Sequence, residues 1–418
     1  MANLLLVETN GRYYFDYLKE LGHRLTLLTS SVNRCLSVVA FDRLSLVDDL
    51  ILVEPFARDE VRRRVLERHA RYPFDAVLSP SDARLVESAH LCEALSLPFL
   101  KPRLAVLLRN KYLTRRRLSE AGIPQPRYAL ASNVDELQYA LDDIGYPAVV
   151  KPTNGWDSHN VVLVRDRVER RLAEAYFQKP LFADFGDPSV SPAIVEEFLD
   201  GPLISAESMS CKGNHVLLGV SQRLISPPPL CQEIGGWFPS TEVPVAAVNN
   251  YLITILDALN YEHGAAHTEM IVTSSGPRLV ELNPRMPGGV IPRVLGFGLG
   301  INIYDAIVEL QQGRMPTLPP ALPADDPPRV IGMRWKVTRD SGRLKGIRWT
   351  KARPNEVLQC DVVPRLGDSI QPADLMPRRI AYVMAAGPDA TQALASAEDY
   401  LSGLELDLER DADAVAAR

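Results

Sequence analysis

Two short apolar segments near the middle of the chain constrain its fold more than any other feature. Residues 267–272 (HTEMIV) and 280–285 (VELNPR) are separated by turn-forming residues, a pattern that predicts a β-hairpin. Side chains two positions apart on a strand lie on the same face. Glu281 and Asn283 therefore point together, and the partner strand is expected to bring Glu269 beside them.

The three oxygen-bearing side chains of this hairpin are of the kind that bind Mg²⁺. Carboxylate and amide oxygens are its usual protein ligands, and phosphate oxygens of a bound nucleotide complete its shell. We therefore predict that Glu269, Glu281 and Asn283 hold the metal, with Arg285 placed to offset charge on a transferring phosphoryl group. A hairpin with ordinary surface acids would account for Glu281 alone, but less well for the full set.

Four further segments occur in the order expected for the ATP-grasp superfamily, whose members use ATP and Mg²⁺ to activate a carboxylate as an acyl phosphate. Residues 109–112 (RNKY) and 121–126 (AGIPQP) resemble the helix and turn that lead into the family's nucleotide domain. Residues 146–152 (YPAVVKP) resemble its lysine-bearing strand, and residues 194–199 (IVEEFL) resemble its adenine-binding hinge. Together with the hairpin, the resemblance covers about half of the chain.

The resemblance implies a set of ATP-binding residues. Lys111 and Lys151 stand where the family places lysines that contact ATP phosphates. A lysine that ends a buried strand is costly unless it meets an anion, which supports this role for Lys151. Ser158 and Arg223 are further candidates for the phosphates. The hinge is expected to hold adenine through backbone groups and apolar walls. Its residues are Glu196, Glu197, Phe198 and Leu199.

Two positions depart from the family pattern. The loop at residues 153–160 (TNGWDSHN) has one glycine, although the family's loop is usually rich in small residues that let backbone N–H groups wrap phosphates. Leu203 stands where many relatives have an acid for the ribose hydroxyls. In the helix predicted at residues 110–121, we expect Arg115, Arg116 and Arg117 to face solvent.

Catalytic candidates lie at the ends of the hairpin. Several relatives have an arginine near position 267, where this chain has a histidine, as in the amino-acid ligase branch of the family. His267 and Arg285 are therefore predicted to act on the acyl phosphate.

Candidate substrate contacts are less specific. Gly288 and Gly289 precede a predicted helix, whose free N–H groups suit a substrate carboxylate. A tight turn explains these glycines equally well. Trp237 lies in the proline-rich stretch 225–244, which we expect to be irregular, and it is either a wall of the substrate pocket or a packing residue.

The fold class predicted for the whole chain is α/β. Residues 1–108 alternate short apolar strands with helices, which predicts an N-terminal Rossmann-like domain, and residues 79–82 (SPSD) end one strand where such sheets bind ligands. Residues 109–315 are assigned to the ATP-grasp domain, with a small nucleotide subdomain at about 126–200. Residues 329–418 are assigned to a small C-terminal α+β domain.

Composition limits the partners. The formal net charge of −6 argues against nucleic-acid binding, and no apolar stretch is long enough for a membrane span. Five scattered cysteines without a CxxC pair and an early acid at Glu8 predict a cytoplasmic protein.

The resemblance implies ATP- and Mg²⁺-dependent ligation of a carboxylic acid to an amine, with Mn²⁺ able to replace Mg²⁺. The branch it points to is the L-amino-acid ligases, which make dipeptides in bacterial secondary metabolism, so amino acids are the expected substrates and analogy favours a homodimer. Two alternatives stay open. One is another ATP-grasp reaction, such as loading an amino acid onto a carrier-protein thiol or carboxylating a nucleotide precursor. The other is a nucleotide-binding protein that has lost catalysis.

Overall fold

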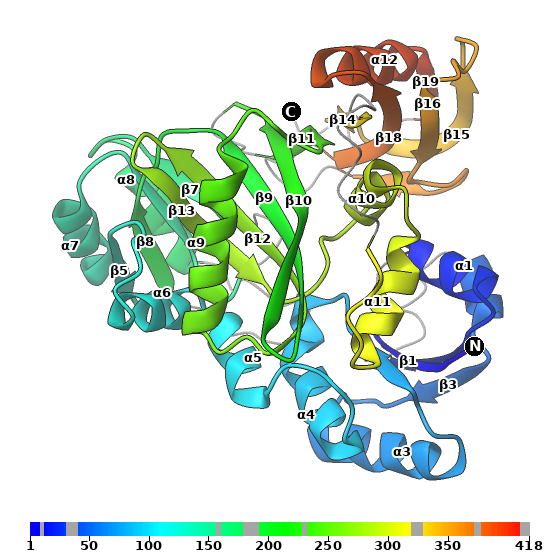
Figure 1. Cartoon of the computed structure of the whole chain (residues 1–418). Helices are drawn as coiled ribbons and strands as arrows, with labels where there is room; N and C mark the ends of the chain where they lie inside the picture. The colour runs from blue at the N-terminus through cyan, green and yellow to red at the C-terminus, as the bar shows by residue number, and fades with distance from the viewer. Residues whose placement is uncertain are drawn as a thin grey trace.

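A computed structural model describes residues 1–8, 12–30, 41–155, 160–178, 192–227, 232–318, 329–371 and 378–409. Within these residues the strands form four sheets, and helices cover their faces (Figure 1). The N-terminal sheet, a small antiparallel sheet and a large sheet of eight strands follow one another along the chain. The fourth sheet, of three strands, lies in the C-terminal region.

The N-terminal sheet is parallel, with the order β3-β2-β1-β4. Its strands are β1 (Asn3–Val7), β2 (Arg24–Thr29), β3 (Asp49–Leu52) and β4 (Ala76–Leu78), and its helices are α1 (Arg12–Glu20), α3 (Arg58–Arg71) and α4 (Leu85–Leu95). Strands β1, β2 and β4 bury apolar residues on both faces, as expected for a parallel sheet covered by helices, whereas edge strand β3 leaves Leu50 and Leu52 exposed. The predicted Rossmann-like arrangement is confirmed.

The small sheet lies on the far side of a helical connection made by α5 (Pro102–Leu108) and α6 (Lys111–Glu120). Its order is β5-β8-β6-β7, and α7 packs on one face through apolar residues such as Leu137 and Leu141. Asn110 caps α6 by accepting a hydrogen bond from the Leu113 N–H, which fixes where the helix carrying Lys111 begins. The elements are β5 (Tyr128–Ala131), α7 (Val134–Ile144), β6 (Ala148–Pro152), β7 (Val162–Val164), α8 (Arg170–Glu174) and β8 (Ala193–Glu197).

The large sheet has the order β13-β12-β9-β10-β11-β14-β18-β16. Its first five strands are β9 (Leu203–Cys211), β10 (Asn214–Ile225), β11 (Glu233–Phe238), β12 (His263–Thr273) and β13 (Gly276–Asn283). Helix α9 (Val245–Ala258) lies across one face of this part (Figure 1), where Ile204, Val220 and Met270 pack against it. The predicted hairpin is confirmed as β12 and β13, with Glu269 opposite Glu281.

Strand β11 corrects one prediction, because it lies within the stretch that we expected to be irregular. Two glycines in it give little intrinsic preference for a strand. Neighbouring backbones approach them closely: a Cβ atom on Gly236 would lie 2.3 Å from the Gln222 carbonyl oxygen, and one on Gly235 would lie 2.5 Å from that of Met333. Pairing with β10 and β14 therefore creates this strand, and local sequence does not reveal it.

The C-terminal region continues the large sheet through the pairing of β14 with β11. Its elements are β14 (Val330–Thr338), β15 (Gly342–Trp349), β16 (Val357–Val362), β17 (Ser369–Ile370), β18 (Arg378–Gly387), α12 (Ala390–Ser402) and β19 (Leu404–Glu409). Strands β17, β15 and β19 form the three-stranded sheet. The region predicted as a separate domain thus shares a sheet with the preceding one.

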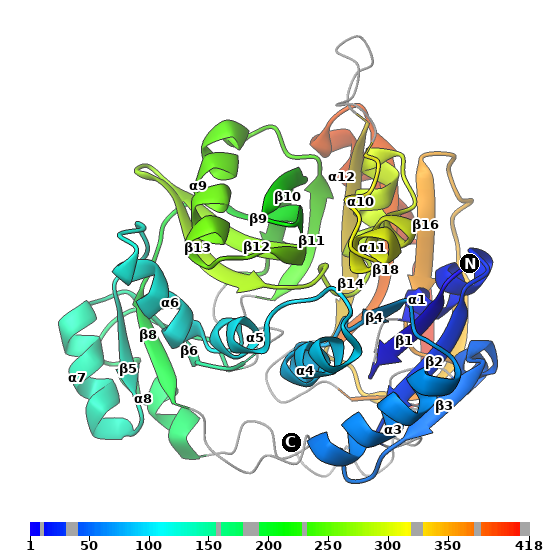
Figure 2. The same cartoon turned by 60° about the horizontal axis from the view of Figure 1, so that its bottom comes forward.

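Helices α10 (Ile291–Leu299) and α11 (Ile303–Gln311) join the N-terminal sheet to the C-terminal strands (Figure 2). Their apolar side chains belong to one core with Leu4 of β1, Ile331 of β14 and Met384 of β18. Among the described helices, none alone is long and apolar enough to span a membrane. Helices α10 and α11 together would pass on length and composition, but they are bent by 101° at the break between them.

Candidate functional site

The face of the large sheet opposite α9 carries a row of polar side chains. Strand register places Glu281, Glu269, Ser205 and Ser221 side by side across β13, β12, β9 and β10. The next row consists of Asn283, His267, Glu207 and Gly219. Because side chains alternate along each strand, the residues between these positions point to the core under α9.

His267 lies at the centre of these rows and bonds to acids on two sides. Its Nδ1 is 2.9 Å from Oε1 and 3.0 Å from Oε2 of Glu207, and its Nε2 is 3.3 Å from Oε1 of Glu269. Burial disfavours the charged imidazole, but the two carboxylates outweigh it and raise the pKa of His267 to about 9. The ring is therefore an imidazolium at neutral pH.

Arg223 of β10 supplies a second cation beside Glu269. Its guanidinium forms an ion pair with Glu233 of β11, and its Nη1 lies 3.5 Å from Oε1 of Glu269 and 3.3 Å from Nε2 of His267. Burial would raise the pKa of Glu269, but the hydrogen bond from His267 and the charge of Arg223 lower it to about 2. Glu269 is thus ionised and flanked by two positive groups.

The predicted metal ligands lie together on the hairpin. Glu269 and Glu281 are register partners, and Asn283 follows on the same face opposite His267. Lys111 reaches Glu281 from α6, with 2.7 Å between Nζ and Oε1, and its Nζ also donates to the Gly155 carbonyl at 2.7 Å. Two carboxylates and an amide form an oxygen donor set that fits Mg²⁺.

That donor set is incomplete by itself. Among the described residues, no group of three or more His, Cys, Asp or Glu side chains is arranged to hold a metal. Mg²⁺ commonly takes only one or two carboxylates together with substrate phosphates, so the arrangement suits a nucleotide-dependent ion better than a resident one.

A second charged cluster lies where the small subdomain meets the hairpin. Lys151 of β6 and Arg115 of α6 both bind Glu196 of β8, at 2.7 Å from Nζ to Oε2 and 2.8 Å from Nε to Oε1. Burial would raise the pKa of Glu196, but the two cations lower it to about 2. Burial also lowers the pKa of Lys151, against the effect of Glu196. The anion that neutralises Lys151 in this structure is thus Glu196.

Arg115 corrects the prediction that the arginines of this helix face solvent. Its side chain is 2% exposed, and its Nη2 donates to the carbonyls of Leu279 at 2.7 Å and Val280 at 3.1 Å. Arg116 is exposed, as predicted. A possible signal was the spacing of Arg115 three residues before buried Leu118, which puts both on one helix face.

The rest of the predicted hinge lies at the end of β8. Glu197 pairs with Arg127, at 3.3 Å from Oε2 to Nε, and the Phe198 N–H donates to the Pro147 carbonyl at 3.2 Å. The side chain of Phe198 is 44% exposed and that of Leu199 is half-buried. Adenine binding by this segment stays a prediction. Ser158 lies outside the described residues.

Arg285 is held by an acid from the N-terminal domain. Its guanidinium binds both oxygens of Asp82, with 2.8 Å between Nε and Oδ1, and its Nη1 donates to the Met286 carbonyl at 2.9 Å. Burial would lower the pKa of Arg285, but Asp82 outweighs it and raises the pKa. Asp82 follows β4 at its carboxyl end, so the segment weighed as a ligand site in the N-terminal sheet meets the predicted catalytic arginine.

The remaining candidates lie apart from this cluster. Gly288 and Gly289 are exposed in the turn before α10, and Gly289 has φ +61°. Trp237 is the register partner of Gln222, whereas Gly236 is that of Arg223, so Trp237 lies on the opposite face of the sheet from Arg223.

Four residues that contact the predicted site were missed or undervalued from sequence: Asp82, Arg115, Glu207 and Glu233. Glu207, four residues after Leu203, was assigned no role from sequence. Glu207 lies two residues from Ser205 on a strand of small residues, which leaves room for a charged side chain. This pattern could have indicated that Glu207 is buried.

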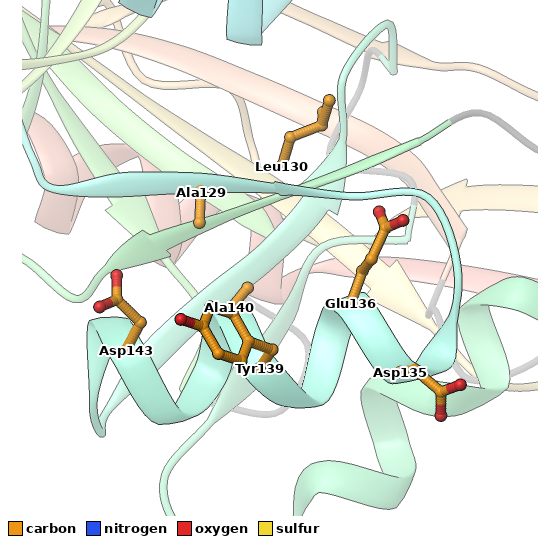
Figure 3. Close-up of a pocket in the computed structure, with 7 residues that line it drawn as sticks. All are labelled: Ala129, Leu130, Asp135, Glu136, Tyr139, Ala140 and Asp143. Carbon is orange, nitrogen blue, oxygen red and sulfur yellow. The ribbon is translucent and has the colours of Figure 1, made fainter.

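A cavity of about 490 Å³ lies away from this cluster, between β5 and α7 (Figure 3). Asp135, Glu136 and Asp143 line it together with Tyr139, which is 79% exposed. Of the described residues that line this cavity, none is basic, so it does not suit the phosphates of a nucleotide.

Comparison with known proteins gives the class of the chain. Residues 108–289 match the ATP-grasp domain family, residues 15–99 match the ATP-grasp N-terminal domain, and residues 334–409 match the L-amino acid ligase C-terminal domain 2. The chain belongs to the ATP-grasp superfamily.

Within that superfamily the chain resembles the L-amino acid ligases. The crystal structure of an L-amino acid ligase from Bacillus licheniformis superposes with a TM-score of 0.81 at 22% identity, covering 98% of this chain and 99% of the other. Dapdiamide A synthase of Enterobacter agglomerans is 28% identical over 241 residues, 55% of this chain and 54% of that protein. The L-arginine-specific L-amino acid ligase of Bacillus subtilis is 22% identical over 254 residues, 59% and 60% of the two chains. The matches thus span less than two thirds of either curated relative.

Proposed function

We propose that the protein is an ATP- and Mg²⁺-dependent ligase that joins the carboxylate of one amino acid to the amine of another. The observation that carries this proposal is the set of three oxygen ligands, Glu269, Glu281 and Asn283, surrounded by cations from four parts of the chain. The names of its relatives, which include a dapdiamide synthase and an L-amino acid ligase, support the choice of substrates.

In the proposed reaction, a substrate carboxylate oxygen attacks the γ-phosphorus of ATP, and ADP leaves. The resulting acyl phosphate is then attacked at its carbonyl carbon by the amine, and phosphate leaves with formation of the amide. Bound Mg²⁺, for which Mn²⁺ can substitute, would neutralise phosphate charge.

The chain's own contribution is to hold charges in place. Lys111, through its contact with Glu281, stands at the edge of the predicted metal site and can turn to a phosphate oxygen. His267 and Arg223 lie on the other side of Glu269, where they can stabilise negative charge on a phosphoryl group. Arg285 is held in a fixed orientation by Asp82 on the side of the N-terminal domain.

The test is phosphate release with ATP and Mg²⁺ in the presence of the twenty amino acids, singly and in pairs, with mass spectrometry of the products. A new dipeptide mass together with ADP supports the proposal and identifies both substrates. ADP release that requires a thiol acceptor would replace it with carrier loading. ATP binding without ADP release in any combination would contradict it.

A matched pair of variants separates the site from the fold. Glu281→Gln removes one predicted metal ligand, whereas Glu398→Gln removes an exposed acid that pairs with Arg334 in the C-terminal region. We expect only the first to lose product formation.

A further inference from the structure

Glu207 is the most deeply buried carboxylate of the polar face. It lies on β9 in the middle of the large sheet and is 0% exposed. A carboxylate without solvent is costly unless its oxygens are bonded, and both oxygens here lie within 3.0 Å of the same ring nitrogen, Nδ1 of His267.

The strands on either side leave Glu207 one direction for a polar contact. Its register partner on β12 is His267, and its partner on β10 is Gly219. A Cβ atom at position 219 would lie 2.5 Å from the ring of Phe238, so this aromatic ring fills the space on that side. The sheet thus directs the carboxylate of Glu207 towards the imidazole.

This contact determines how His267 faces the predicted metal site. With Nδ1 donating to Glu207, the ring presents Nε2 to the opposite side, 3.3 Å from Oε1 of Glu269 and 3.3 Å from Nη1 of Arg223. A ring turned over would leave Glu207 without its donor. A carboxylate behind a histidine is a common means of fixing the orientation of its ring.

We propose that Glu207 is a positioning residue that orients His267 for the acyl-phosphate chemistry and touches neither substrate nor metal. This inference rests on the proposed function for its kinetic part, and on the geometry alone for the orientation of the ring. It adds a role for a side chain that the sequence resemblance leaves unassigned.

The first experiment measures the ring directly. In protein labelled with ¹⁵N at histidine, the Nδ1–H proton that bonds to a carboxylate is expected as a strongly deshielded signal. His267→Gln identifies this signal among the seven histidines, because the signal is lost in that variant. In Glu207→Gln the proton is expected to shift upfield. An unchanged Nδ1–H signal in Glu207→Gln would overturn the proposal, whatever reaction the protein catalyses.

The second experiment uses a double-mutant cycle in the ligation assay. We expect Glu207→Gln to lower kcat by about tenfold to a hundredfold, the range known for groups that orient a functional histidine, with little change in KM for ATP. In a His267→Gln background the same substitution should have almost no further effect, because its target is gone. Equal losses in both backgrounds would overturn the proposal.

Two controls keep the result interpretable. Glu207→Asp retains the charge and should recover part of the activity lost in Glu207→Gln. Asp48→Asn removes an acid that pairs with Lys19 at 2.9 Å at the edge of the N-terminal sheet, and it reports the effect of losing an ion pair elsewhere. If no amino-acid pair gives product with the unaltered protein, the proposed function fails while the histidine signal still decides the positioning role.

Discussion

The charged cluster on the face of the large sheet and the one between the small subdomain and the hairpin differ in how their charges are matched. In the second cluster, Glu196 takes one cation on each oxygen, and all three side chains are buried. On the large sheet, Glu269 and Glu281 remain partly exposed, and Glu269 shares two cations that also bind other acids.

We infer from this difference that the same types of side chain serve two purposes. A carboxylate whose two oxygens are both taken by buried cations is a structural connection, because any ligand would have to break it. Carboxylates that remain partly accessible, such as Glu281 at 2.7 Å from Lys111 and Glu269 at 3.5 Å from Arg223, can take a metal and phosphates as further partners. We therefore assign chemistry to the large-sheet face and assembly to the Glu196 cluster.

The largest expected effect is on activity at the large-sheet face. Glu269→Gln removes the carboxylate shared by His267 and Arg223, and we expect turnover to fall by about a thousandfold, or about 4 kcal/mol of transition-state stabilisation. Steady-state product formation over a range of Mg²⁺ concentrations measures it. The melting temperature should change far less than in the Glu196 variant below. If Glu269→Gln keeps its turnover at the Mg²⁺ concentration that the unaltered protein needs, Glu269 is not a metal ligand.

The next effect is on stability, in the Glu196 cluster. Glu196→Gln leaves Lys151 and Arg115 without their anion in a buried place, and we expect the protein to lose about 3–5 kcal/mol of unfolding free energy. Chemical denaturation followed by fluorescence gives the value. Replacing exposed Arg116 by Ala on the same helix is the matched control and should change stability by no more than about 0.5 kcal/mol. If Glu196→Gln changes the unfolding free energy as little as the control does, the Glu196 cluster does not stabilise the fold, and the distinction between the two clusters is wrong.

The sequence predicted the fold and the hairpin well, because both depend on short-range patterns. Alternation along β12 and β13 is enough to place Glu269, Glu281 and Asn283 on one face, and strand–helix alternation is enough to indicate the N-terminal parallel sheet. Strand β11 was not predictable in this way, because its glycines are held between β10 and β14 by pairing with residues far along the chain.

The ion-pair partners of the charged residues also could not be predicted from local sequence patterns. Arg115 meets Glu196 across 81 positions, and Arg285 meets Asp82 across 203. The sequence of a single helix or strand does not indicate which distant acid will pair with a basic side chain that it carries. The cost of burying a lysine predicted that Lys151 needs an anion, and only the assembled structure shows that Glu196 fills this role here.

A smaller effect is expected at the contact between the N-terminal domain and the hairpin. Asp82→Asn keeps a hydrogen-bond acceptor for Arg285 but removes the charge, so the guanidinium is less firmly oriented. We expect kcat/KM to fall by about tenfold, or about 1.4 kcal/mol. Kinetics with the amino-acid substrates measures it. An unchanged kcat/KM would mean that the orientation of Arg285 does not depend on this pair.

The smallest effect concerns pH and follows from the pKa of Glu196. The pKa of Glu196 in the folded protein is about 2, below the value of 4.5 for a free glutamate. Its contribution to stability is therefore complete well above pH 4.5 and is lost as pH falls towards 2. Relative to neutral pH, about 1 kcal/mol of that contribution should be gone at pH 4, since the unfolded chain takes up the proton first. Chemical denaturation of the unaltered protein and of Glu196→Gln at pH 7, 5 and 4 measures this loss. The difference in unfolding free energy between the two proteins should become smaller as the pH falls. Glu120→Gln, which removes the acid of an exposed pair with Arg116, is the matched control and is measured in the same way. If the difference in unfolding free energy between the unaltered protein and Glu196→Gln stays constant from pH 7 to pH 4, Glu196 is not held as an ion by Lys151 and Arg115. The contrast between a buried, fully paired cluster and an accessible one would then be wrong.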